Sequence, residues 1–235
     1  MNETQSRRPA RAGLIDALGL PTVVLTGGML GFGTLCQSSG IDLFSALLAT
    51  LTIWALPGQI LLVDMYAAEA SLWSIVVAVS ISGVRFLPMT VAVVPRMRAG
   101  LPHPALQLAV AQMLSANSFL YALASAGRFN ARGRAIYFTV FASVCLIVAA
   151  AATVAGHIAA SALPAAVALG LLFVNMMFLT CMLSGLREGA LLASAGFGLI
   201  AGPVFHHLNP DHGLIIAGVL AGSLGYLLFG RRRRP

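Results

Sequence analysis

The chain has 235 residues, of which 59% are hydrophobic and 9% are charged. Its apolar stretches approach or exceed the ~20 residues that a helix needs to cross a bilayer, and they do not alternate as the strands of a membrane barrel do. The net charge is +7 and all 14 Lys+Arg residues are arginine. All except Arg85 lie between or beyond the apolar runs rather than in a patch suited to nucleic acid. The sequence therefore predicts an all-α polytopic membrane protein with no nucleic-acid partner.

Eight apolar segments are predicted to cross the membrane, some of them broken or short. They are residues 18–37, 42–63, 71–94, 105–124, 135–158, 164–183, 189–205 and 213–229. We expect a single transport domain (18–229) in a bacterial inner membrane, with a basic N-terminal tail (1–17) and an arginine-rich tail (230–235) in the cytoplasm.

The positions of the arginines favour this number of spans. The inside segments would hold Arg7, Arg8, Arg11, Arg128, Arg132, Arg134, Arg187 and Arg231 to Arg234. An outside loop would hold only Arg96 and Arg98, in agreement with the positive-inside rule.

Glycines recur in the first, seventh and eighth segments. Gly27/Gly31 and Gly218/Gly222 have the GxxxG spacing that allows close contact between helices. A second interpretation is that the first and seventh segments unwind near a substrate site, because each contains Gly-Phe-Gly, at 31–33 and 196–198. Corresponding glycine-interrupted segments in two halves are typical of transporters built from inverted repeats.

The second segment is interrupted at Trp54-Ala-Leu-Pro57-Gly58-Gln59. Proline removes a backbone donor and glycine permits unusual dihedral angles, so we predict a half-helix that begins near Gly58. Its free N–H groups and positive dipole end would suit a carboxylate, and the Gln59 amide could donate and accept hydrogen bonds. The alternative is a simple proline kink.

Arg85 lies inside the third segment, between Gly83 and Pro88. A charge at this depth costs at least ~2.5–3.5 kcal/mol on the insertion scale, so it needs a partner. No acidic residue is predicted to lie deep enough to pair with it. Arg85 is predicted to clamp an anionic substrate group, and the alternative is that serines and carbonyls freed by Pro88 satisfy it.

Asn117 and Asn175 are the other polar residues predicted to lie at membrane depth. Each could contact the substrate, or each could form a hydrogen bond between helices. We find no catalytic motif, so the chain is not expected to be an enzyme. No cofactor or metal site is expected.

Several motifs resemble the AzlC family, the large subunit of two-component branched-chain amino acid exporters. The aromatic-Ala-Gly-Ala-Ser-Gln-Phe stretch of that family is similar to Trp54–Ile60, and its Asp/Asn-x-Arg-His motif is similar to Gly83–Phe86. Further matches are Ser71-Leu72-Trp73, Pro95-Arg96 and Leu169–Phe173.

The chain departs from the family at charged positions. Gly83 and Phe86 replace the residues that flank the family arginine, and Ser115-Ala116-Asn117 stands where the family has Thr-Asp-Glu. The resemblance implies export of amino acids together with a small AzlD-like membrane subunit, and a homo-oligomer is possible. The expected substrate site is Gly58, Gln59, Arg85, Asn117 and Asn175. A rival hypothesis is a non-transporting membrane subunit whose Arg85 pairs with an acid on another protein.

Overall fold

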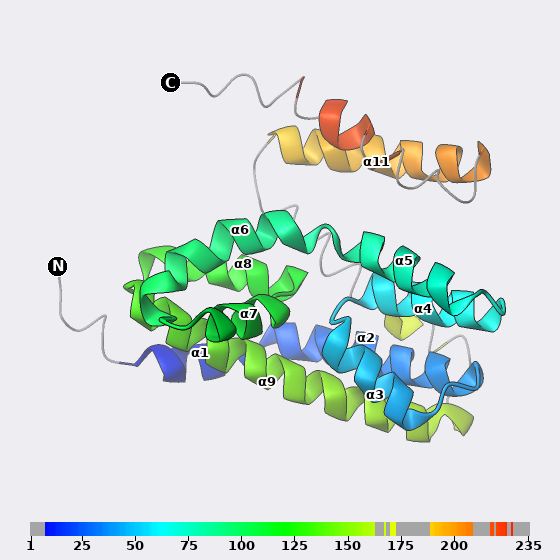
Figure 1. Ribbon diagram of the computed structural model, residues 1–235, viewed down its shortest axis with the longest axis horizontal. Coiled ribbons are helices and arrows are strands. Elements are labelled where there is room, and N and C mark those ends of the chain that lie inside the picture. Colours follow the sequence, from blue (N-terminus) through cyan, green and yellow to red (C-terminus); the bar gives the residue numbers. More distant parts are fainter. Residues whose placement is uncertain are drawn as a thin grey trace. The chain divides into compact units, whose positions relative to one another are not determined.

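The computed structural model describes residues 8–162, 167, 170–172, 189–208, 217, 218, 220–224 and 227 (Figure 1). The chain divides into two compact units, residues 1–176 and 177–235. Every regular element among the described residues is a helix, so the all-α prediction is confirmed for this part of the chain.

Two long parallel helices, α2 (Leu20–Ser38) and α9 (Ala131–Ile158), form the base of the first unit. A Cβ added at Gly156 of α9 would lie 2.8 Å from the Cα atom of Leu30, and one added at Gly33 of α2 would lie 2.8 Å from the backbone nitrogen of His157. Glycine is therefore required here because the two backbones touch.

Helix α1 (Pro9–Ala17) precedes α2 and packs on the first turns of α9. Asp16 fixes this contact, because its carboxylate accepts hydrogen bonds from Arg128 (2.9 Å) and from the Tyr137 hydroxyl (2.8 Å). Part of the segment that the sequence predicts as a tail is thus an ordered helix.

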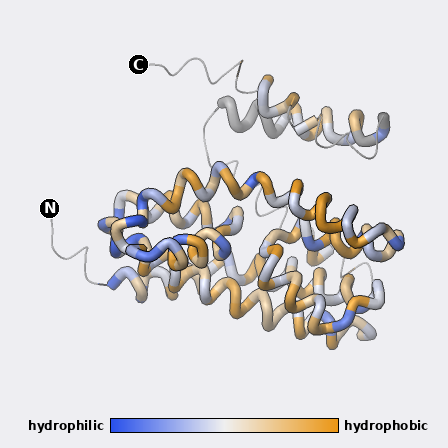
Figure 2. Tube along the Cα trace, viewed as in Figure 1, coloured by the Kyte–Doolittle hydropathy of each residue, from blue (hydrophilic) through white to orange (hydrophobic). Residues whose placement is uncertain are grey.

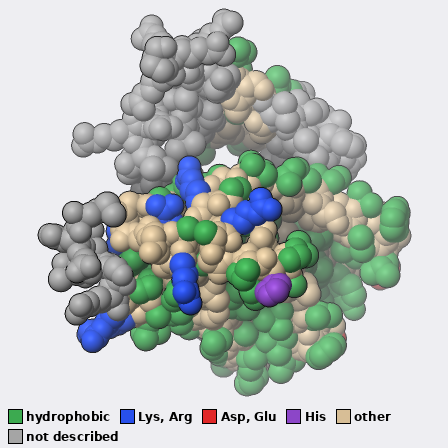
Figure 3. All heavy atoms as spheres, turned by 60° about the vertical axis from the view of Figure 1, so that its left-hand side comes forward, with side chains coloured by type: hydrophobic (Ala, Val, Ile, Leu, Met, Phe, Trp, Pro, Cys, Tyr) green, Lys and Arg blue, Asp and Glu red, His purple; other side chains and the backbone are tan. Residues whose placement is uncertain are grey.

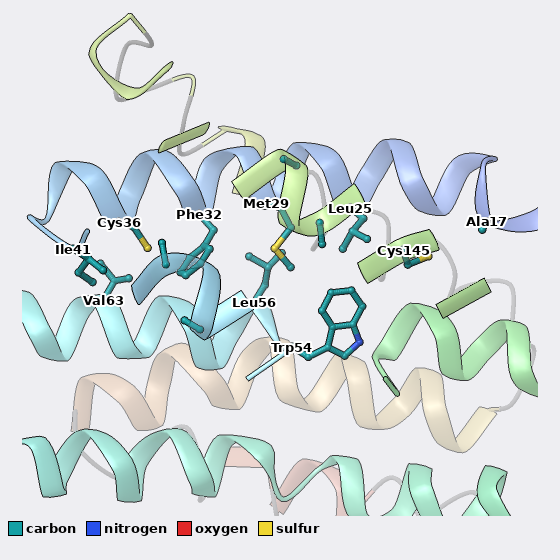
Figure 4. Close-up of a cluster of buried hydrophobic side chains, with 14 of the residues drawn as sticks. Ala17, Leu25, Met29, Phe32, Cys36, Ile41, Trp54, Leu56, Val63 and Cys145 are labelled. Atoms are coloured by element: carbon teal, nitrogen blue, oxygen red, sulfur yellow. The ribbon is translucent and has the colours of Figure 1, made fainter. Parts of the chain in front are cut away.

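Helices α3 (Leu43–Thr52) and α4 (Leu56–Ala67) form a hairpin. The chain enters with α3, breaks at Ile53–Ala55 and returns with α4, so that Val63 lies beside Ile41 (Figure 4). His157 at the end of α9 bonds to the Ile41 carbonyl oxygen (2.9 Å) and holds the start of this hairpin.

Helices α5 (Leu72–Gly83) and α6 (Phe86–Met97) form one long element with a 49° bend. The bend follows from Pro88, which has no N–H and whose ring would clash with the carbonyl of Val84. A short turn, η2 (Arg98–Gly100), then packs against Arg132 and Ala135 at the start of α9.

Helices α7 (Pro104–Gln112) and α8 (Ala116–Ala124) are bent by 118° where the sequence predicts one span over 105–124. The chain therefore turns back and reaches α9 through η3 (Ser125–Gly127). Ser115 and Ser118 explain the break, because together they form a capping box that starts a new helix.

Two apolar cores hold these elements together. The first packs the α3–α4 hairpin against α2 and the part of α9 from Phe141 onward, with Phe32, Trp54 and Cys145 among its buried side chains (Figure 4). The second packs α6, α7 and α8 against the first half of α9, around Met97, Leu114 and Phe138. Helix α9 thus supports both hairpins.

The described residues contain two helices long and apolar enough to cross a membrane, Leu20–Ser38 and Ala131–Ser161, or up to four spans if each bent pair counts as one. Apolar residues run along these helices (Figure 2). Eight spans and an inverted repeat are therefore not confirmed. The segments predicted at 164–183 and 213–229 lie largely outside the described residues.

Apart from Arg85, the described arginines of the first unit lie in or beside three segments that contact one another: α1, the end of α6 with η2, and the start of α9. They are Arg8, Arg11, Arg96, Arg98, Arg128, Arg132 and Arg134. Figure 3 shows several arginine side chains on the face turned forward. The prediction that Arg96 and Arg98 lie on the other side from Arg128 was wrong, because η2 packs on the start of α9.

In the second unit, α11 (Gly189–Leu208) is the longest described element. Gly198 lies against Ala221, since a Cβ there would be 3.8 Å from the Ala221 methyl group. No atom of the described structure lies within 4 Å of a Cβ at Gly218 or Gly222, so the GxxxG spacing makes no close contact there.

Candidate functional site

The first unit contains three helix breaks: Ile53–Ala55 between α3 and α4, Val84–Arg85 between α5 and α6, and Met113–Ser115 between α7 and α8. A hydrogen bond from Trp54 to Met113 joins the first break to the third, and the contact of Gly58 with Ser82 brings the start of α4 near the second. Irregular backbone at membrane depth is tolerated only where protein or a water-filled cavity surrounds it. The three breaks therefore mark the part of this fold in which a polar ligand could be held.

Side-chain hydrogen bonds tie the tips of the two hairpins together. The indole N–H of Trp54 donates to the Met113 carbonyl oxygen (3.1 Å), and the Gln112 amide donates to the Thr52 carbonyl oxygen (2.6 Å). Trp54 is buried and has φ 51°, a left-handed conformation that a large side chain rarely adopts. Such strain persists only where the surrounding structure enforces it.

The half-helix predicted near Gly58 is present as α4 and begins at Leu56. Its first intrahelical hydrogen bond runs from the Gln59 N–H to the Ala55 carbonyl oxygen (2.9 Å). The N–H groups of Leu56 and Gly58 precede this bond, and no side chain caps the helix. Two N–H donors and a positive dipole end are therefore available for an anion.

Arg85 lies at the second break, three residues after Ser82, which contacts the start of α4. A Cβ at Gly58 would lie 3.5 Å from the Ser82 hydroxyl oxygen, which places the start of α4 beside the end of α5. Among the described residues, Arg85 has no carboxylate within ion-pair distance and makes no hydrogen bond. Its guanidinium lies 5.3 Å from the centre of the Phe86 ring.

Gln59 is completely buried and joins a polar chain across three helices. Its amide nitrogen donates to the Thr50 hydroxyl of α3 (3.3 Å), which lies 3.0 Å from the Thr153 hydroxyl of α9. The amide oxygen Oε1 is the one buried side-chain nitrogen or oxygen in the described structure that has no hydrogen-bond partner. A buried acceptor without a donor is rare in native proteins.

Asn117 is the second residue of α8 and is half-buried, with no hydrogen-bond partner among the described residues. Since the Trp54 bond joins the two hairpin tips, the starts of α4 and α8 lie close to each other. Asn175 lies outside the described residues.

The structure therefore places Gly58 near the break that contains Arg85, and it places the start of α4 near the start of α8, where Asn117 lies. Sequence reasoning missed Thr50 and Thr153, which read as ordinary residues of apolar helices. It also missed the capping role of Ser115, for which the pair of serines at 115 and 118 was the available signal.

The charge pattern of the site is positive. Two helix N-termini and one guanidinium lie in this region, whereas the carboxylates among the described residues lie near helix ends, at Asp16, Asp42, Asp64 and Glu69. Such an arrangement can hold a carboxylate by charge-assisted hydrogen bonds.

The family model described as AzlC protein matches residues 22–163. This match extends from α2 to the end of α9 and includes both hairpins and all three breaks. No curated protein and no solved structure matches the chain.

Proposed function

The chain belongs to the AzlC family, and on this premise we propose that it is a transport subunit for small apolar amino acids or related organic anions. The family is associated with branched-chain amino acid transport and is not a family of enzymes. Membership and the apolar helices make the chain a helical membrane protein.

One observation supports this proposal above the others: Arg85 lacks a counter-charge among the described residues and lies next to the uncapped start of α4. Arg85 is exposed on the first unit, and a cation at membrane depth is costly unless it is paired. A substrate carboxylate would supply the missing charge, with Arg85 as a bidentate clamp and the Gly58 N–H as a second donor.

The remaining contacts suit an aliphatic substrate. The Ile53 methyl group lies 3.2 Å from a Cβ built at Gly58, so the start of α4 has an apolar neighbour. In this proposal Asn117 contacts the polar end of the substrate, and Asn175 is retained as a predicted contact.

The two hairpins suggest how access could alternate. Their tips are joined by the Trp54 and Gln112 hydrogen bonds. Helix α4 returns so that Val63 lies beside Ile41 (Figure 4), and α8 is bent by 118° from α7. We propose that separation of these tips opens the site toward one side of the inner membrane and then the other. An inverted repeat in which each half contributes one hairpin would fit such a cycle.

A second candidate is a membrane subunit that does not itself transport, whose Arg85 pairs with an acid of another protein. The observation that favours it is exposure along α5–α6, where Trp73 is 76% and Leu87 is 66% exposed. This face would contact lipid or a small AzlD-like subunit, and a second copy of the chain is a further possible neighbour.

Transport by vesicles separates the two candidates. The full chain, co-reconstituted with an AzlD-like membrane subunit, should exchange radiolabelled leucine across the membrane. Arg85→Lys and Arg85→Gln should reduce exchange at least tenfold, whereas Arg132→Gln, an exposed arginine at the arginine-rich end, should not. Full exchange by Arg85→Gln would rule out the clamp, and a stable complex through Arg85 without any exchange would favour the partner subunit.

A further inference from the structure

We infer that the arginine-rich end of the first unit is a docking surface for anionic phospholipids. This end consists of α1, the end of α6 with η2, and the start of α9. It is a different part of the unit from Arg85, and the inference holds whatever the chain transports. It therefore goes beyond the proposed function.

Packing contacts hold these segments together although they carry like charges. A Cβ at Gly100 of η2 would lie 2.8 Å from the Cβ of Ala135 and 2.9 Å from the Cα atom of Arg132, so η2 touches the start of α9. A Cβ at Gly13 would lie 3.4 Å from the backbone nitrogen of Phe141, so α1 also touches α9. Like charges that packing brings together repel one another, and bound anions relieve that repulsion.

Protein acceptors satisfy two of the arginines at this end. Arg128 pairs with Asp16 (2.9 Å), and the Nε of Arg134 donates to the Phe129 carbonyl oxygen (2.8 Å). Asp16 is the one carboxylate here among the described residues, and it is already paired. The other arginines are exposed, with no ion pair and no side-chain hydrogen bond within the described part of the chain. They are Arg8, Arg11, Arg96, Arg98 and Arg132. Their guanidinium groups are available to anions from the surroundings.

The position of these arginines along α9 matches the headgroup layer of a membrane. Helix α9 has 28 residues and is therefore about 42 Å long, whereas the hydrocarbon core of a bilayer is about 30 Å thick. Large apolar side chains are exposed on α9 from Ile136 to Ile158, and Arg132 lies one turn before the first of them. The start of α9 thus extends beyond the hydrocarbon to the depth at which lipid phosphates lie.

Apolar side chains are exposed beside the arginines. Ile15 of α1 is 58% exposed, and Leu18, directly after this helix, is 61% exposed. A membrane surface suits both kinds of side chain, because a lipid has a charged headgroup and apolar chains. Free phosphate or a nucleic acid would leave the apolar side chains in water. The face with several arginines in Figure 3 therefore fits an anionic phospholipid.

Binding of fluorescent phosphatidylglycerol to the full chain in a non-ionic detergent tests this assignment, with fluorescence anisotropy as the measurement. Unlabelled phosphatidylglycerol should displace the probe. Phosphatidylcholine, whose headgroup has no net charge, should displace it less well by on the order of tenfold or more, since each arginine contributes about fivefold in affinity for an anionic surface. Inorganic phosphate and a short RNA should also compete less well than phosphatidylglycerol.

Substitutions locate the binding at this end. Arg98→Gln should weaken phosphatidylglycerol binding by about fivefold, and the double variant Arg96→Gln/Arg98→Gln by roughly 25-fold. Arg96→Lys/Arg98→Lys keeps both charges and should keep most of the affinity. Arg85→Gln is the matched control for Arg98→Gln: Arg85 is also exposed but lies about 16 Å from Arg96 along α6, beyond the Debye length of about 8 Å. It should leave lipid binding unchanged.

Several results would overturn the inference. Equal displacement by phosphatidylcholine would mean that headgroup charge is not recognised, and tighter binding of phosphate or RNA would assign this end to a soluble anion. Equal weakening by Arg85→Gln and Arg98→Gln would attribute the binding to the net charge of the whole chain. Should the double glutamine variant not fold, Arg98→Gln decides alone, and an unchanged affinity contradicts the inference. The transported substrate is absent from every measurement, so failure here leaves the proposed function standing.

Discussion

Replacing Gly156 by alanine should separate α2 from α9 and destabilise the whole first unit. The new methyl group would lie 2.8 Å from both the Cα and the carbonyl carbon of Leu30, and these backbone atoms cannot move aside as the end of a side chain can. Ordinary contact starts near 3.4 Å, so the helices must shift by more than half an ångström. Overpacking of this kind costs about 1–3 kcal/mol.

Thermal unfolding of the purified protein in detergent measures this cost. For a chain of this length, ~1 kcal/mol corresponds to a change in Tm of about 2–4 °C, so Gly156→Ala should lower Tm by roughly 2–12 °C. Gly83→Ala is the control, because its Cβ would meet no atom within 4 Å. Combining Gly156→Ala with Gly33→Ala should cost less than the sum, since one separation relieves both clashes. An unchanged Tm for Gly156→Ala would refute the contact between α2 and α9.

Two smaller predictions concern other contacts. Trp54→Phe removes the donor to the Met113 carbonyl oxygen and should cost about 1–3 kcal/mol, seen as a lower Tm and slower leucine exchange; an unaltered Tm would mean that the tips are not joined there. Hydrogen bonds from the hydroxyl and then the N–H of Ser45 hold the pKa of Asp42 below its usual value. This group therefore stabilises the fold above an unfolded pKa of about 3.9 and loses that contribution as pH falls through its lower folded pKa. The Tm difference between wild type and Asp42→Asn should shrink on acidification, and a difference independent of pH would contradict this origin.

Local chemistry predicted some breaks and not others. Pro57 and Gly58 mark the start of α4 because proline and glycine leave a signature in the sequence. The break before Ser115 has no such residue, and hydropathy measures how apolar a segment is but not its direction. From the sequence, α7 and α8 were therefore predicted to form one span over 105–124, although the two helices are bent by 118°.

The same limitation explains the misplaced arginines. Each hairpin was interpreted as a crossing of the membrane, so Arg96 and Arg98 were predicted to lie on the opposite side from Arg128. The structure instead has the segment that follows Arg98 in contact with the start of α9. Only the contact of Gly100 with Arg132 reveals that the two arginine clusters share one end.

Candidate site residues were found where a polar or charged side chain was conspicuous in an apolar run, as Arg85 and Gln59 are. Their environment was not predictable, because Thr50 and Thr153 are 103 residues apart in sequence and meet only in the folded protein. The hydrogen bond between the Trp54 indole and Met113 likewise joins two hairpins that no local pattern relates.

The central claim is that Arg85, at the break between α5 and α6, holds the carboxylate of the substrate. The most direct test is whether leucine stabilises the purified chain against thermal unfolding. A ligand present at 100 times its Kd stabilises the folded state by about 2.7 kcal/mol, so saturating leucine should raise the Tm of wild type and of Arg132→Gln by several degrees. Arg85→Gln should show no such rise at the same concentration. An equal rise in Arg85→Gln would contradict the account, since the substrate would then be held without the guanidinium.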